Sequence, residues 1–189
     1  MSARVLPVPE SMQAEMRGVS WRDDPRCPPF TALRLVRPRF CDLSGATRVG
    51  ELIVAAAVAE AIAGVFAALY ERGFPIASIA RIEAYGGDDG ASMAANNSSG
   101  FNFRVIDGTS ALSMHALGLA VDINPLWNPW VRGDRIEPAA GARFVDRATA
   151  HPGMIKRPGP VTAAFDGIGW VWGGDWPDLQ DYHHFATRR

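Results

Sequence analysis

The stretch Ser113-Met-His-Ala-Leu-Gly-Leu-Ala-Val-Asp-Ile-Asn-Pro125 decides how the second half of the chain folds. Residues 119–124 alternate apolar and polar side chains, which predicts a strand with Asp122 on its more polar face. A carboxylate on such a strand needs a partner, and a metal ion is a suitable one. His115 lies seven positions before Asp122, a spacing that puts the two on opposite faces of a straight strand. Gly118 offers a bend between them.

The clearest helix spans residues 55–72, where apolar residues recur every four positions and Gly73 follows as a terminator. Alternation and turn residues place the other elements. We expect strands at 31–37, 50–54 and 101–106, an extended segment at 74–82, a short helix at 161–169, a loop at 86–100 and connecting structure at 125–141. The element mix predicts an α+β domain over residues 30–189, with helices packed on a mainly antiparallel sheet. Residues 1–29 read as irregular, with one short helix near 9–17.

Amino-acid composition limits which classes of function are possible. The 189 residues are 48% hydrophobic, enough for one domain with its own core. Lys and Arg number 19 against 20 Asp and Glu, so neither nucleic acid nor an anionic lipid surface is indicated as a partner. We expect a monomer. The longest apolar stretch, residues 53–70, is Ala-rich and carries Glu60 and Gly64, so we expect no membrane span.

Two further features concern the chain's environment. Residues 1–17 carry prolines and glutamates where a signal peptide has an apolar run, so we expect no export signal there. Cys27 and Cys41 are the only cysteines, and either a disulfide or two reduced thiols is compatible with them. Because no thiolate zinc pattern exists, any metal must use nitrogen and oxygen ligands.

Histidines and acids gather in two segments. His115 precedes Asp122, and the closing segment carries Asp181, His183 and His184. A catalytic zinc ion takes three His or carboxylate ligands and keeps one position open for water. These spacings alone do not distinguish a metal site from histidines that are satisfied by hydrogen bonds.

Larger motifs make that distinction. The block Ser113-x-His115-x-x-Gly-x-Ala-x-Asp122-Ile-Asn-Pro, followed by Asn128-Pro129, resembles the signature of M15-type zinc metallopeptidases, the group of D-alanyl-D-alanine carboxypeptidases (VanY-like) and L-Ala-D-Glu endopeptidases. Trp172-Gly-Gly-Asp-Trp followed by Asp181-x-x-His184-Phe resembles the second half of that pattern. Residues 96–104 look like the family's arginine segment. Together these blocks span about half the chain.

The resemblance implies roles for individual residues. His115, Asp122 and His184 match the family's zinc ligands, and Asp181 matches its general base. Arg104 matches an arginine near the substrate carbonyl or carboxylate, although Phe103 stands where the family often has cysteine. The implied fold is a small α+β domain of the Hedgehog/DD-peptidase type.

Three other residues are candidate second-shell or substrate residues. They are Ser113, which we expect to fix the loop before the first ligand, Trp172, and His183. Because neighbouring side chains of an extended segment point oppositely, only one of His183 and His184 can face the metal, and the family pattern selects His184. Asp175 or Asp178 is the expected acceptor for a ligand's second N–H.

The resemblance implies hydrolysis of peptidoglycan stem peptides at the cell wall, as a D-Ala-D-Ala carboxypeptidase or an L-Ala-D-Glu type endopeptidase. A non-catalytic, zinc-containing wall-binding or structural domain is the alternative, and a hydrolase acting on an unrelated peptide is a third. A Ser113–His115–Asp122 triad is disfavoured because no GxSxG elbow is present. The acids of residues 86–90 lack the spacing of a calcium loop.

Overall fold

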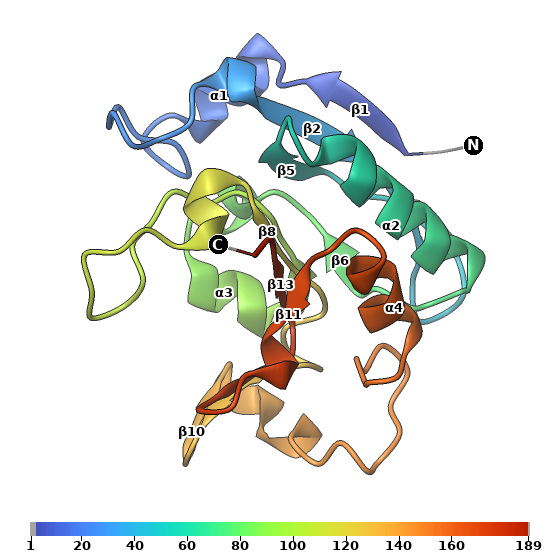
Figure 1. Cartoon of the computed structure of the whole chain (residues 1–189). Coiled ribbons are helices and arrows are strands. Elements are labelled where there is room, and N and C mark those ends of the chain that lie inside the picture. The colour runs from blue at the N-terminus through green and yellow to red at the C-terminus, as the bar shows by residue number, and fades with distance from the viewer. Residues whose placement is uncertain (1–2, 189) are drawn as a thin grey trace.

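The computed structural model describes residues 3–188 and is an assembly of helices and small sheets (Figure 1). The helices are α1 (Glu10–Met16), α2 (Ala59–Glu71), α3 (Asp89–Ala94) and α4 (Pro160–Asp166). Short 3₁₀ turns are η1 (Phe30–Ala32), η2 (Ile82–Tyr85), η3 (Met114–Leu117), η4 (Ala139–Phe144) and η5 (Gly173–Asp175).

The strands are short and mostly antiparallel. They are β1 (Arg4–Pro7), β2 (Leu33–Arg37), β3 (Arg39–Cys41), β4 (Thr47–Val49), β5 (Leu52–Ala55), β6 (Ser78–Ile79), β7 (Asn97–Ser98), β8 (Ala120–Asp122), β9 (Trp130–Arg132), β10 (Arg135–Glu137), β11 (Val171–Trp172), β12 (Gln180–Asp181) and β13 (His184–Ala186). They form the sheets β1-β2-β5, β11-β13-β8 and β10-β9-β12 and the pairs β3-β4 and β6-β7, of which only β6-β7 is parallel.

Backbone hydrogen bonds join the first two of these sheets. Phe101 N donates to Ile53 O at 2.8 Å, and Ser99 and Asp122 exchange a pair of bonds. Ala55 N donates to Gly118 O at 2.9 Å. The segment 99–101 therefore lies between β5 and β8. This places the site-bearing strands β8 and β13 one segment away from the N-terminal sheet.

The main core lies between these strands and the two helices α2 and α4, which pack side by side (Figure 1). Apolar residues at helical spacing give α2 one buried face, which includes Ile62, Phe66 and Leu69. From α4, Phe165 stacks on Phe185 of β13 with ring centroids 4.0 Å apart. The residue next to His184 is thereby anchored in the core.

Most predicted elements are confirmed within one to four residues, including the helix that ends at Gly73, whose φ is +63°. The α+β class with antiparallel sheets is also confirmed. The predicted strand at 101–106 is wrong, because that segment pairs only through a bridge at Val105. Two segments hold more structure than expected, since α3 lies within 86–100 and β9 and β10 lie within 125–141.

The expectation of irregular structure for residues 1–29 is wrong at Arg4–Pro7, where strand β1 pairs antiparallel with β2. The short helix predicted near residues 9–17 is confirmed as α1. Val8 and Met16 are buried in a second apolar cluster with residues of β2 and β5. An edge strand with little alternation left no clear sequence signal. The domain boundary expected at residue 30 stays a prediction.

Cys27 and Cys41 are free thiols. Among residues 3–188, no helix combines the length and the apolar character that crossing a membrane requires.

Candidate metal centre

His115 is placed by the short turn η3. Ser113 caps this turn, and its side-chain oxygen accepts a hydrogen bond from His115 N at 3.2 Å. Gly118 ends the turn in the left-handed region, with φ of +69°. The bend predicted at Gly118 is thus present, and it turns the chain from η3 into β8.

Asp122 and His184 are brought together by strand register. The two residues are direct partners in the antiparallel pair β8–β13. Because paired residues of antiparallel strands project from the same face, their side chains meet. Residues 62 positions apart in the sequence become neighbours through this register. The ladder continues with Phe185 opposite Val121, both buried in the core, which fixes the register.

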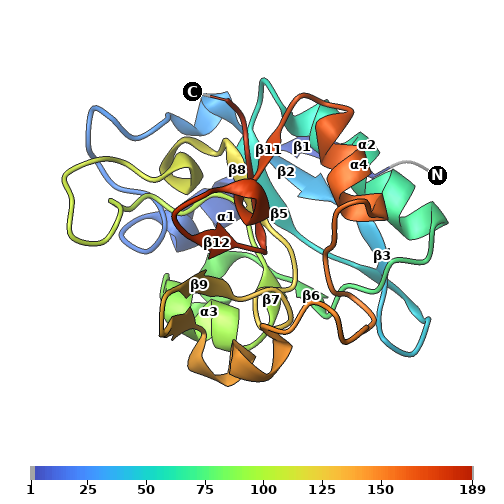
Figure 2. The same cartoon turned by 60° about the horizontal axis from the view of Figure 1, so that its bottom comes forward.

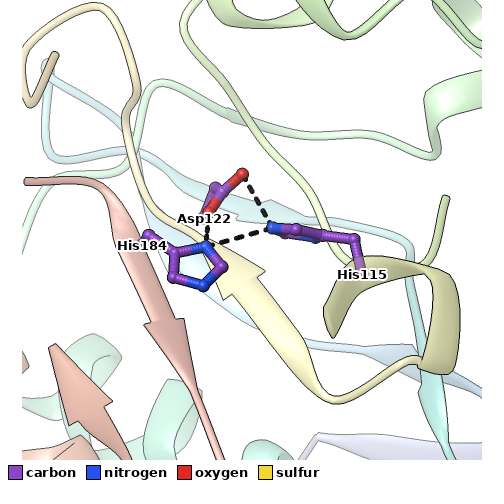
Figure 3. A group of neighbouring side chains, drawn as sticks. All are labelled: His115, Asp122 and His184. Carbon is purple, nitrogen blue, oxygen red and sulfur yellow. Dashed lines mark hydrogen bonds and ion pairs between the residues drawn. The ribbon is translucent and has the colours of Figure 1, made fainter. Parts of the chain in front are cut away.

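The side chains of His115, Asp122 and His184 converge on one point, as Figure 3 shows. His184 Nδ1 lies 3.0 Å from Asp122 Oδ1 and 3.2 Å from His115 Nε2. His115 Nε2 lies 3.1 Å from Asp122 Oδ2. Ligands bound tetrahedrally at zinc–nitrogen and zinc–oxygen distances stand about 3.3 Å from one another. The spacing and chemistry of these donors therefore fit a metal ion such as zinc.

The ring orientations are set by backbone carbonyl groups. Nδ1 of His115 lies 2.6 Å from Gly100 O, and Nδ1 of His183 lies 2.7 Å from Asn128 O. A carbonyl accepts only from a protonated nitrogen, so His115 presents Nε2 as its free donor atom. The expected acceptors were Asp175 or Asp178, and for Asp175 this is wrong, because its carboxylate pairs with Arg157.

The charged groups around Asp122 keep its carboxylate ionised. Burial favours the neutral form of Asp122, but the charges of His115 and His183 outweigh it and hold the pKa of Asp122 well below its usual range. Burial likewise disfavours protonated His115, yet the neighbouring Asp122 raises the pKa of this ring. Asp122 is therefore ionised at neutral pH, as a metal ligand must be.

Asp181 lies beside the three donors on strand β12. Burial raises the pKa of its carboxyl group, and the nearby charge of His183 offsets this only in part. His183 Nε2 is 3.0 Å from Asp181 Oδ1, but this buried oxygen accepts no hydrogen bond from any described residue. An orphaned buried acceptor calls for a missing donor, and a water molecule held by a metal ion would supply it.

His183 does not turn away as expected for an extended segment. A turn separates β12 from β13, and His183 Nε2 comes within 3.9 Å of Asp122 Oδ2. His183 nevertheless lies outside the group of three convergent donors. Sequence reasoning missed the turn because an extended reading of residues 181–185 seemed sufficient.

Arg147, which the sequence analysis did not single out, stabilises the position of His183 through Asn128. It donates to Asn128 Oδ1 at 2.7 Å and to three backbone carbonyl groups, and its guanidinium lies over the ring of Tyr182. Burial lowers the pKa of Arg147 to about 10. Arg147 thus fixes Asn128, whose carbonyl group holds His183.

The donors lie in a cleft of about 1270 Å³. Arg104, another predicted site residue, lines this cleft and forms an ion pair with Asp89 of α3. The sequence analysis placed Asp89 in a loop and missed this pair. Helix α3 and strands β9 and β12 each contribute residues to the lining of this cleft. Figure 2 shows where these three elements lie in the fold.

Trp172 occupies the core and does not face the cleft. Its ring packs on Phe185, and its Nε1 donates to Tyr182 O at 2.9 Å. Trp176, which follows in the same block, lines the cleft and packs against His184 with ring centroids 5.5 Å apart. The role predicted for Trp172, contact with the metal ligands or with the substrate, stays a prediction.

Gly118 gives the first testable prediction. A Cβ at this position would lie 2.5 Å from Ala55 N and 3.0 Å from Val54 C, backbone atoms that cannot move aside cheaply. The left-handed conformation adds about 1–2 kcal/mol for any residue with a Cβ. We expect Gly118→Ala to lower the free energy of unfolding by more than about 2 kcal/mol, as measured by urea denaturation.

The matched control is Gly64→Ala in helix α2, where a Cβ would meet nothing within 4 Å. Replacing a helical glycine there should raise the stability by roughly 0.5–1 kcal/mol. Equal effects of the two substitutions would contradict the role assigned to Gly118.

Comparison with known proteins agrees with this site. Residues 107–187 match the profile of an M15 peptidase family described as D-alanyl-D-alanine carboxypeptidase. No curated protein and no solved structure matched the chain. The matched segment contains the three convergent donors and Asp181. This match, which covers less than half of the chain, supports an M15-type peptidase.

Proposed function

We propose that this protein hydrolyses peptide bonds in peptidoglycan stem peptides, with a zinc ion bound by His115, Asp122 and His184. The observation that carries the proposal is the convergence of these three donors inside a large cleft. Beside them lies a carboxylate oxygen of Asp181 that accepts no hydrogen bond from residues 3–188. Three ligands with an open fourth position are typical of catalytic zinc, whereas structural sites use four protein ligands.

When bound, zinc supplies a Lewis acid and a water molecule whose pKa falls to about 7. Asp181 is the proposed general base. Its raised pKa and its buried oxygen, which accepts no hydrogen bond from the described residues, suit it to accept a proton from water and to return one to the leaving amine. Ser113 holds the turn that presents His115.

Arg104 is the proposed cation at the reacting carbonyl group or carboxylate of the substrate. Its ion pair with Asp89 fixes the guanidinium at the cleft wall and offsets its charge. An arginine held in this way suits hydrogen bonding to a carbonyl oxygen that becomes negative during the reaction. Within the proposal, the fold is of the Hedgehog/DD-peptidase type and the chain acts as a monomer.

Digestion of purified peptidoglycan tests the function, with fragments identified by mass spectrometry. Released D-alanine would identify a carboxypeptidase, and a new internal terminus would identify an endopeptidase. We expect a chelator to abolish product formation and one equivalent of zinc to restore it. If the zinc-loaded protein binds the wall but forms no product, the non-catalytic wall-binding domain replaces this proposal.

A further inference from the structure

The hairpin β9–β10 adds a wall of charged and aromatic side chains to the cleft. Strand β9 pairs with both β10 and β12, and Asp181 lies directly opposite Trp130. Paired residues share a face of a sheet, and so do residues two apart on one strand. Asp181, Trp130 and Arg132 therefore project from the same face, and all three line the cleft.

The other strand of the hairpin completes this face. Arg135 is the register partner of Arg132, and Glu137 is the partner of Trp130. Arg135 forms an ion pair with Glu137, and its guanidinium carbon lies 5.5 Å from the centroid of the Trp130 ring. These contacts confirm that Arg135, Glu137 and Trp130 share one face.

The two arginines form a like-charge pair directly across the hairpin, an arrangement that destabilises antiparallel strands. Glu137 neutralises Arg135, whereas Arg132 makes no ion pair with any residue among 3–188. The side chains that the hairpin itself contributes to this face, two arginines and one glutamate, therefore carry one net positive charge. Arg132 is exposed at the cleft wall, where its guanidinium is accessible to an anionic group of a ligand.

The position of Arg132 sets the place of that group. Along β9, Arg132 lies two residues beyond Trp130 and hence about 7 Å from the level of Asp181. An extended peptide covers the same distance in about two residues. An anion held by Arg132 would thus lie about two residues from a bond positioned at Asp181.

We propose that Arg132 binds a free carboxylate of the peptide substrate, about two residues from the bond that is cut. This assignment rests on the proposed peptidase function and adds a specificity residue to it. The carboxylate can belong to an acidic side chain or to the chain terminus, and both present the same planar anion to a guanidinium.

Binding measurements separate this assignment from the function itself. In the Asp181→Asn background, which keeps substrates intact, calorimetry would compare a stem peptide that has free carboxylates with versions amidated at the terminus or at the acidic side chain. We expect Arg132→Gln to weaken binding of the peptide with free carboxylates by roughly 10-fold. Arg132→Gln should not change the affinity for the peptide that is amidated at the recognised carboxylate. The amidated version that shows no change therefore tells whether Arg132 binds the terminal or the side-chain carboxylate.

Kinetics give a second readout with wild-type Asp181. Arg132→Gln should raise KM for the free peptide and leave kcat unchanged, because the contact is distant from the reacting bond. Arg132→Lys should restore part of the loss. The control Arg72→Gln removes an exposed arginine at the end of α2 and should change neither constant. Folding is checked by Tm, which relief of the like-charge pair should leave unchanged or raise.

Several outcomes would overturn the assignment. It fails if Arg132→Gln weakens free and amidated peptides equally or leaves both unchanged. It also fails if Arg188→Gln, at another cleft-lining arginine, abolishes the carboxylate preference while Arg132→Gln does not. Absence of any hydrolysis by wild type, together with an Arg132-dependent carboxylate preference in binding, would instead count against the peptidase proposal alone.

Discussion

His115→Ala is expected to remove the metal ion and to lower kcat/KM by about 1000-fold or more. The ring supplies one of three donors, and two remaining protein ligands hold zinc poorly. Metal assistance contributes several kcal/mol to the transition state, and each ~1.4 kcal/mol is a factor of ten in rate. Metal content by mass spectrometry and peptide hydrolysis would be measured on the same preparation.

Loss of His115 also removes a partner of the buried Asp122, so we expect the variant to be less stable than wild type. Asp122→Asn should lose metal and activity as well. Because the amide has nearly the same shape as the carboxylate, this loss would not be due to misfolding. His151→Ala is the control, because His151 stands between Trp127 and Phe144 and does not line the cleft. Full metal content in His115→Ala would contradict the ligand assignment.

Asp181→Asn is expected to keep the metal ion and to lower kcat by roughly 10²–10⁴-fold. This range is the usual contribution of a positioned general base. The amide keeps the size of the side chain but accepts protons poorly. The three donors do not include Asp181, so metal content should equal that of wild type.

Asp175→Asn is the control, because it removes another carboxylate of the same segment. Its carboxylate is exposed and pairs with Arg157, so we expect activity close to wild type. If Asp181→Asn retained full activity, another group would have to take the proton, and the proposed role of Asp181 would be wrong. If it lost the metal ion as well, Asp181 would be part of the metal site.

The sequence predicted the parts of this site whose signals are local. The bend at Gly118, the alternation that makes residues 120–122 a strand, and the order of the motif blocks all lie in short windows. These windows placed His115, Asp122 and His184 in one site, and the structure brings the three together. Their role as ligands remains a prediction.

Other features could not be predicted, because they depend on contacts between distant residues. Arg104 meets Asp89 because residues 95–103 return the chain to α3, and the half-buried Arg147 bonds to Asn128 across 19 positions. The turn between Asp181 and His184 redirects His183, which an extended reading does not allow. The hairpin β9–β10 had short strands rich in charge, so its residues read as connecting structure.

An anomalous difference map at the zinc absorption edge, from crystals of the zinc-loaded protein, tests the central claim most directly. The account predicts one strong peak about 2.0–2.2 Å from His115 Nε2, His184 Nδ1 and a carboxylate oxygen of Asp122. Asp181 should lie near the peak without binding it directly. A peak elsewhere, or no peak while the three side chains remain hydrogen-bonded to one another, would contradict it.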